Sequence, residues 1–211
     1  HKGINVFIVE KTMEGLVVGV KENKLGIRGS DTHSLMFTDV KVPAANLMGE
    51  EDKGFSYIMQ HFALERLIMG VNAHARAEYA LEYTLDYMSE RTAFGKTIDK
   101  FQALRHTVAE MASEVEMVKS FNYAIANNLN SGDYVVKEAS MSKLLATKIA
   151  DEVIYKCLQM LGGYGYMEDY PLARMFRDSR LGPIGGGTSE ILKEIIAKIV
   201  IDKKEYKPAA N

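Results

Sequence analysis

The sequence lacks several features on which whole classes of protein depend. Its 211 residues include one cysteine, Cys157, which excludes a disulfide framework, a four-ligand structural zinc site and an iron–sulfur cluster, and which suits a reducing compartment. There is no apolar run of about 18 residues, the length of a membrane span, and no basic-then-apolar export signal. We therefore expect no metal site and no stable membrane insertion.

Neither sign of charge dominates the chain. The chain has 26 lysine and arginine residues and 28 aspartate and glutamate residues, which gives a formal charge of -2. This composition does not indicate a polyanionic partner. We expect no nucleic acid binding. The first residue is His1 rather than methionine, which suggests a processed product or a piece of a longer chain.

Residues 1–53 have the pattern of β-strands. Residues 4–9 and 16–20 are short β-branched runs, and residues 34–42 alternate in polarity until Pro43, which cannot donate into a sheet ladder. A sheet of three strands cannot bury its own faces. We expect residues 1–53 to be the end of an incomplete β domain, packed on the helices or completed by sequence outside this chain.

From Gly54 onward the apolar residues recur at three- and four-residue steps, which predicts helices. Pro171 suits the first turn of a helix, and Thr188 or Ser189 can cap the last one. Short connections between such helices predict an antiparallel helical bundle over residues 54–211, so the chain is mainly α. The expected helices are residues 54–91, 101–129, 134–161, 171–181 and 189–202.

Glu65 lies at an unusual place in the first of these helices. Ile58, Phe62, Glu65 and Met69 are spaced as one helix face, which places the carboxylate in an apolar stripe. Burial raises the pKa of a carboxylate, as a base working near neutral pH requires. Alternatively, Glu65 pairs with an arginine at a helix contact or lies at the wet edge of the stripe. Arg66, about 100° further round the helix, reads by itself as a solvated charge.

Three further clusters carry residue types that bind anions. Gly162 and Gly163 directly follow a helix, where exposed amides can bind phosphate, although a glycine helix stop has the same pattern. The run 185–187 leads into a helix N-terminus and suits an anion or a polarised carbonyl, or is a hinge. Arg91 and Lys96 flank Phe94 in a tight loop that suits a phosphate or water.

Together, the order and spacing of these clusters resemble the C-terminal half of the acyl-CoA dehydrogenase family. Gln159-x-x-Gly162-Gly163-x-Gly165-Tyr166-x-x-Asp169-x4-Arg174-x3-Asp178 matches the longer signature of that family at every fixed position. Glu90-Arg91-x-x-Phe94-Gly95-Lys96 and Gln102 precede it, and Gly187-Thr188 follows it. Residues 7–10, 25–32 and 37–43 resemble the end of the family's middle β domain. The resemblance covers the whole chain but only about half of the family's usual length.

The resemblance implies a flavoenzyme that desaturates an acyl-CoA thioester between Cα and Cβ, as in fatty acid β-oxidation. A glutamate takes the α proton, the β hydrogen leaves as hydride to FAD, and an electron-transferring flavoprotein reoxidises the cofactor. In most members the base precedes the Gly-Thr pair, a position that is Gly186 here. Long-chain and isovaleryl-type members carry it on the long helix before an arginine, where this chain has Glu65 and Arg66. We therefore assign the base to Glu65, in a chain more similar to the long-chain branch.

The same resemblance assigns residues to cofactor and substrate. The residues implied to contact FAD are Arg91, Phe94, Gln102, Gln159, Met160, Leu161, Gly162, Gly163, Thr188, Ser189 and Glu190. The residues implied to line the substrate side are Ala63, Leu64, Arg66 and Gly187, the last of them near the thioester.

Part of the ADP moiety is held by a neighbouring subunit in this family, which implies a homo-oligomer, a tetramer or a dimer, in the bacterial cytoplasm or the mitochondrial matrix. Two alternatives stay open at this point. The protein is an acyl-CoA oxidase-like relative that passes its electrons to oxygen, or the chain is a non-catalytic bundle, a fragment or a scaffold subunit that needs a separate N-terminal half.

Overall fold

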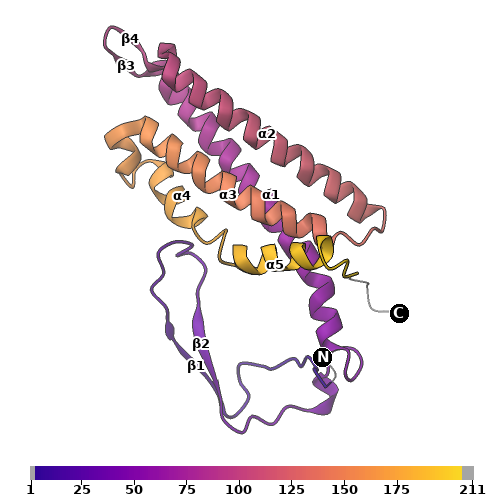
Figure 1. The fold of residues 1–211 in the computed structure, drawn as a ribbon. Helices are drawn as coiled ribbons and strands as arrows, with labels where there is room; N and C mark the ends of the chain where they lie inside the picture. Colours follow the sequence, from indigo (N-terminus) through magenta and orange to yellow (C-terminus); the bar gives the residue numbers. More distant parts are fainter. Residues whose placement is uncertain (1–2, 206–211) are drawn as a thin grey trace. The chain divides into compact units, whose positions relative to one another are not determined.

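The computed structural model describes residues 3–205 (Figure 1). The chain divides into two compact units, one reaching Phe62 and the other beginning at Ala63. The division falls inside the first long helix, α1 (Gly54–Glu90), whose start coincides with the end of the predicted β segment at residue 53.

The first unit holds a small antiparallel sheet. Strands β1 (Leu16–Lys21) and β2 (His33–Phe37) pair with Leu16 opposite Phe37, and a 3-10 turn, η1, covers Ala44–Asn46. β2 ends earlier than the predicted residue 42, because the backbone turns at Asp39 with φ 51°. The strand predicted for residues 4–9 is wrong: this segment forms one bridge, between Phe7 and Leu47, because no described strand lies beside it to complete a ladder.

Both strands leave apolar side chains uncovered. Val17, Leu35 and Phe37 are each more than half exposed. Two strands offer too little surface to bury both faces of a sheet. These uncovered side chains are compatible with an incomplete sheet, which stays a prediction.

The second unit is the predicted helical bundle, in which α3 contacts α2, α4 and α5 (Figure 1). A two-residue hairpin, β3 (Thr92–Ala93) with β4 (Lys96–Thr97), follows α1. The remaining elements are η2 (Ile98–Lys100), α2 (Gln102–Asn130), α3 (Val136–Leu161), η3 (Gly162–Tyr166), α4 (Pro171–Ser179) and α5 (Ser189–Val200). Pro171 is the first residue of α4, and the Thr188 hydroxyl caps α5 by accepting from the Ile191 amide, as predicted.

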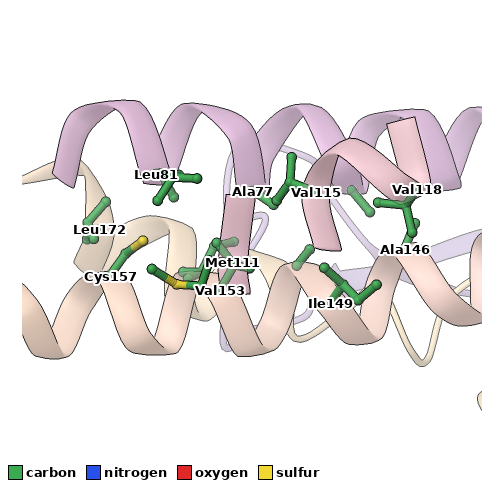
Figure 2. Packing of buried hydrophobic residues seen from close by; sticks show 14 of the residues in the cluster. Ala77, Leu81, Met111, Val115, Val118, Ala146, Ile149, Val153, Cys157 and Leu172 are labelled. Carbon is green, nitrogen blue, oxygen red and sulfur yellow. The ribbon is translucent and has the colours of Figure 1, made fainter. Parts of the chain in front are cut away.

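Small side chains on α1 allow the helices of the bundle to pack closely. Ala73, Ala77 and Ala80 of α1 are buried against apolar residues of α2, α3 and α4 (Figure 2). Alanine costs no side-chain entropy when it is buried. The larger members of this cluster fill the space between the helices: Leu81, Met111, Val115, Val118, Ile149, Val153, Ile154, Cys157, Leu161 and Leu172.

A chain of buried polar groups joins α1, α2 and α3. The Ser142 hydroxyl donates to Asn122 Oδ1, and the Asn122 amide, 2.8 Å from His74 Nδ1, donates to that ring nitrogen. Burial lowers the pKa of His74, which keeps the imidazole neutral and its Nδ1 able to accept. An added Cβ on Gly70 would clash with Ser142 Oγ, so α1 and α3 approach each other closely at this glycine.

The turn before α5 requires glycine. Gly186 and Gly187 have φ values of 62° and 101°, which side-chain-bearing residues rarely adopt. A Cβ on Gly186 would also lie 2.5 Å from Sδ of Met69 on α1. The turn therefore lies directly against α1.

We predict that the thiol of Cys157 is unreactive in the folded protein. Its side chain is fully buried, and burial raises its pKa to about 11, so little thiolate forms at pH 7. Ellman's reagent should report no reactive thiol in the native chain and one per chain in 6 M guanidinium, about the concentration that unfolds even very stable domains. Stoichiometric reaction of the native protein would contradict this burial.

Replacing Gly186 with alanine should destabilise the bundle by both strain and crowding. Gly132 is a matched control, since its φ is 90° but nothing lies within 4 Å of an added Cβ. We expect Gly186→Ala to lower the free energy of unfolding by about 1 kcal/mol more than Gly132→Ala, because overpacking adds to the backbone strain. In a Met69→Ala background this excess should vanish, as measured by guanidinium denaturation. An equal loss for both alanine variants in the wild-type background would refute the crowding.

Candidate functional site

Glu65 is exposed on α1, so the expectation that it lies enclosed in an apolar stripe is wrong for the described chain. The buried face of α1 here carries Ala63, Arg66 and Leu67. Glu65 is two residues before Leu67, about 200° round the helix, and so it projects from the opposite side.

Glu65 nevertheless lies beside the glycine turn. Met69 follows it by four residues, so the two side chains share one helix face about one turn apart. Met69 is also the residue that a Cβ on Gly186 would touch. The two positions at which the resemblance places a catalytic base, Glu65 and Gly186, are therefore neighbours.

Two buried cations lie beside the next residue of this turn, Gly187. Lys143 of α3 is 0% exposed, and its Nζ donates a hydrogen bond of 2.6 Å to the carbonyl oxygen of Gly187. Arg66, at 7% exposed, has Nη2 4.0 Å from the place of a Cβ on Gly187. Burial and the nearby Arg66 charge lower the pKa of Lys143 to about 8. The expectation of a solvated Arg66 is therefore wrong, because α3 and the turn cover it.

Lys143 was not among the residues selected from the sequence, although its spacing carries a signal. Ala139, Lys143, Ala146, Ala150 and Val153 recur at three- and four-residue steps, and all five are buried. A charged residue within an apolar stripe was expected to be buried. This expectation is wrong for Glu65 but holds for Lys143.

A second group of the expected residues lines one pocket at the other end of α3. A cavity of about 490 Å³ is bordered by Arg91, Gln159, Met160, Leu161, Gly162 and Gly163, together with Tyr87, Ile98, Tyr164 and Met167. Gly162 has φ 60°, and nothing lies within 4 Å of an added Cβ on Gly162 or Gly163. The backbone is therefore open to close approach by a ligand, and the Arg91 guanidinium beside it suits a phosphate. These residues fit the diphosphate and base of a dinucleotide cofactor.

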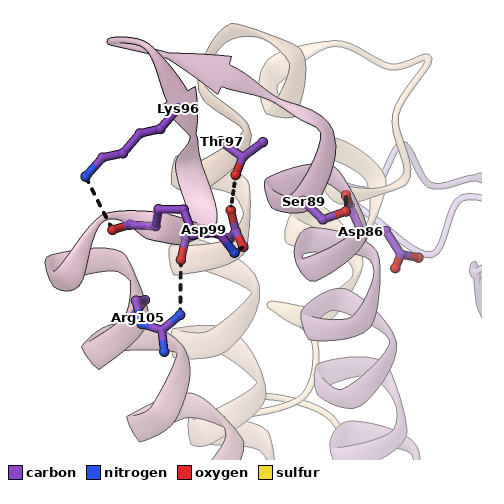
Figure 3. Close-up of polar contacts among 7 residues, drawn as sticks. Asp86, Ser89, Lys96, Thr97, Asp99 and Arg105 are labelled. Carbon is purple, nitrogen blue, oxygen red and sulfur yellow. Dashed lines mark hydrogen bonds and ion pairs between the residues drawn. The ribbon is translucent and has the colours of Figure 1, made fainter.

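Phe94 stands at the tip of the β3–β4 hairpin, 95% exposed. Phe94 and Gly95 have φ values of 51° and 81°, the combination that a two-residue hairpin turn needs. The base of the hairpin is fixed by Asp99, which accepts from Thr97 and Lys100 and whose backbone carbonyl accepts from Arg105 (Figure 3). Hydrogen bonds from Lys100 and Thr97 hold the pKa of Asp99 below its usual value. An aromatic ring on a supported but uncovered turn is suited to contact a ligand or another chain.

The structure does not bring all the expected cofactor residues together. Thr188, Ser189 and Glu190 form the start of α5, next to the turn that Lys143 holds. Gln159 follows Lys143 by sixteen residues on α3, which a helix extends over roughly 24 Å. The pocket beside Gln159 and the start of α5 are therefore two separate places on the bundle.

The other expected residues lie as follows. Ala63 is buried and Leu64 is 43% exposed, so adjacent substrate candidates face different ways. Gln102, the first residue of α2, is exposed. Hydrogen bonds from its own backbone amide and from the Thr188 side chain lower the pKa of Glu190, whose carboxylate thus lies at the positive end of α5.

A membrane-spanning helix and a cluster of metal ligands are both absent from the described residues. Within residues 3–205, no helix combines the length and apolar character that crossing a bilayer requires. The same residues contain no cluster of three or more metal-ligating side chains.

Several proteins are similar in sequence to this chain. It is 40% identical over 202 residues to the mitochondrial long-chain specific acyl-CoA dehydrogenase of Sus scrofa, covering 96% of this chain and 47% of that one. It is 38% identical to a subunit of the caffeyl-CoA reductase–Etf complex of Acetobacterium woodii, covering 96% of this chain and 53% of that one. The chain thus spans about half the length of the relatives it matches.

Solved structures share the fold as well. An acyl-CoA dehydrogenase from Geobacillus kaustophilus superposes with a TM-score of 0.92 at 40% identity, covering 94% of this chain and 52% of that one. A Bacillus anthracis acyl-CoA dehydrogenase in complex with FAD gives a TM-score of 0.90 at 29% identity, over 95% of this chain and 38% of that one. The family model for the acyl-CoA dehydrogenase C-terminal domain matches residues 52–201. The chain therefore belongs to the acyl-CoA dehydrogenase family.

Proposed function

We propose that the full-length protein containing this chain catalyses the FAD-dependent α,β-desaturation of an acyl-CoA thioester, with Glu65 as the base. The observation that carries this proposal is the contact between Met69 and the Gly186 position, one helical turn from Glu65. The turn holds no side chain that could take a proton, and the neighbouring helix supplies a carboxylate beside it.

The exposure of Glu65 is consistent with this role. A base must reach the Cα proton of a bound substrate, so its carboxylate has to face the substrate rather than the interior of the bundle. Leu64 and Ile68 beside it are also exposed, at 43% and 49%, and they offer apolar surface to an acyl chain or to another part of the enzyme. Substrate bound over Glu65 would exclude water from the carboxylate.

The N-terminus of α5 supplies the second element of the mechanism. Removing the α proton places negative charge on the thioester oxygen, and unsatisfied amides at a helix N-terminus stabilise such charge. Gly187 lies at this end of α5, which supports placing the thioester beside it. FAD, when bound, accepts the β hydrogen as hydride.

The two separate groups of cofactor residues support an oligomeric enzyme. The pocket of Arg91 and Gln159–Gly163 fits the ADP part of FAD, whereas Thr188–Glu190 directly follow the glycine turn. We propose that one flavin uses the start of α5 in one subunit and the Arg91 pocket of its neighbour, with Phe94 and Gln102 at the same contact. A homotetramer or homodimer would satisfy this arrangement.

The partners and setting of the enzyme follow from the family. We propose an electron-transferring flavoprotein as the electron acceptor, in line with the relative that is named as part of an Etf complex. That relative is a reductase, so assays should follow both directions of the reaction. We place the activity in acyl-CoA oxidation in a bacterial cytoplasm or a mitochondrial matrix.

The Glu65→Gln variant of the full-length protein tests the assignment of the base. We expect flavin content to stay equal to that of the wild type, while anaerobic bleaching of flavin absorbance by acyl-CoA slows by about 10²- to 10⁴-fold, the usual contribution of a positioned base. The measurement is a stopped-flow trace with acyl-CoA thioesters of several chain lengths.

The control for this experiment is Glu82→Gln, which removes an exposed carboxylate from the same helix. It should bleach at the wild-type rate. Undiminished bleaching by the Glu65→Gln variant would remove Glu65 from the mechanism, and hydrogen peroxide formed without a carrier protein would reassign the enzyme as an oxidase.

A further inference from the structure

Lys143 is a buried charge that the proposed mechanism does not use. It lies about two turns into α3 with its side chain 0% exposed, and Ser142 and Ala146 on the same helix are buried too. Burying an ammonium group lowers the stability of the fold unless hydrogen bonds or an opposite charge compensate for its lost hydration. Within the described residues Lys143 forms no ion pair, and its hydrogen bond goes to a neutral acceptor, the carbonyl oxygen of Gly187.

The hydrogen bond from Lys143 anchors a segment of three consecutive glycines, residues 185–187. Gly185, Gly186 and Gly187 have no side chains to anchor them, and glycine has the largest backbone freedom to lose. Because the peptide unit is planar and trans, fixing the Gly187 carbonyl toward Lys143 also directs the Thr188 N–H away from it. One contact therefore sets the orientation of the peptide at the start of α5.

Arg66 makes this arrangement still more costly for stability. Its guanidinium Nη2 lies 4.0 Å from the place of a Cβ on Gly187, whose carbonyl oxygen accepts from the ammonium of Lys143. Burial, together with repulsion by the Arg66 charge, brings the pKa of Lys143 down to about 8. A fold selected for stability alone would place an apolar side chain at position 143. Buried charges whose pKa is shifted by desolvation and by a specific neighbouring charge are enriched at functional sites.

We propose that Lys143 is a positioning residue for the reaction: its ammonium group holds the Gly186–Gly187 turn, and thereby the thioester, in place against Glu65. This inference rests on the proposed function. Lys143 stands on α3, whereas the turn and Glu65 belong to other parts of the chain. We infer that it fixes the position of the turn relative to Glu65 on α1.

The Lys143→Met variant separates positioning from folding. Methionine is unbranched and of similar length, so it fills the same space without the charge or the hydrogen bond. We expect the melting temperature and the flavin content to be at least those of the wild type, while kcat falls about 10- to 100-fold at nearly constant KM, as a displaced turn predicts.

Two further measurements report on the turn directly. The Ser189 amide donates to the Pro183 carbonyl at 3.0 Å, and its hydrogen exchange should accelerate roughly tenfold in the Lys143→Met variant because the turn loses its anchor. In a Lys143→Ala variant, added propylammonium replaces the missing part of the side chain and should restore part of kcat. The matched control is Lys148→Met, which removes an exposed lysine, with 71% of its side chain accessible, from the same helix.

The outcomes separate the two hypotheses. A wild-type holoenzyme that no acyl-CoA bleaches overturns the proposed function, and this inference with it. A wild type that is bleached, with unchanged kcat and Ser189 exchange in the Lys143→Met variant, overturns the positioning role alone. A lower melting temperature with unchanged kcat per bound flavin, or no rescue by propylammonium, assigns Lys143 to stability and also overturns it.

Discussion

The close approach of α1 to the glycine turn is the contact on which the arrangement of the site depends. Met69 occupies the volume that a side chain at position 186 would need, and a methionine, flexible along its whole length, can follow the contour of a bare backbone. Lys143 of α3 and Arg66 of α1 lie against the next residue of the turn, Gly187. A turn without side chains is thus held from two helices, and the carboxylate beside it stands on one of them.

The bundle could be predicted because its signals are local. Periodicity located all five long helices to within a few residues, and Pro171 and Thr188 marked two helix starts for reasons that operate within one turn. The strand at residues 4–9 failed because pairing is not local: the run has the composition of a strand, but a strand needs a neighbour that the described chain does not provide.

The site was only partly predictable because burial depends on which helix face meets the other helices. The spacing of Ile58, Phe62 and Met69 indicates a stripe, yet the alanines at 73, 77 and 80 define the face that the bundle covers. The side chain of Glu65 is therefore exposed. The side chain of Lys143 is buried, although a lysine is ordinarily expected to face solvent. The joining of Arg91 to Gln159–Gly163 in one pocket could be expected from the family resemblance but not from residue types alone.

The occupation of the space at Gly186 has an evolutionary consequence. A glutamate introduced at position 186 alone would clash with the Met69 sulfur. A smaller residue introduced at position 69 alone would leave a cavity beside Gly186. Moving a carboxylate from helix to turn would therefore require coordinated changes at positions 69 and 186 as well as at 65. The packing thus makes the residue tolerated at one of these positions depend on the residue at another.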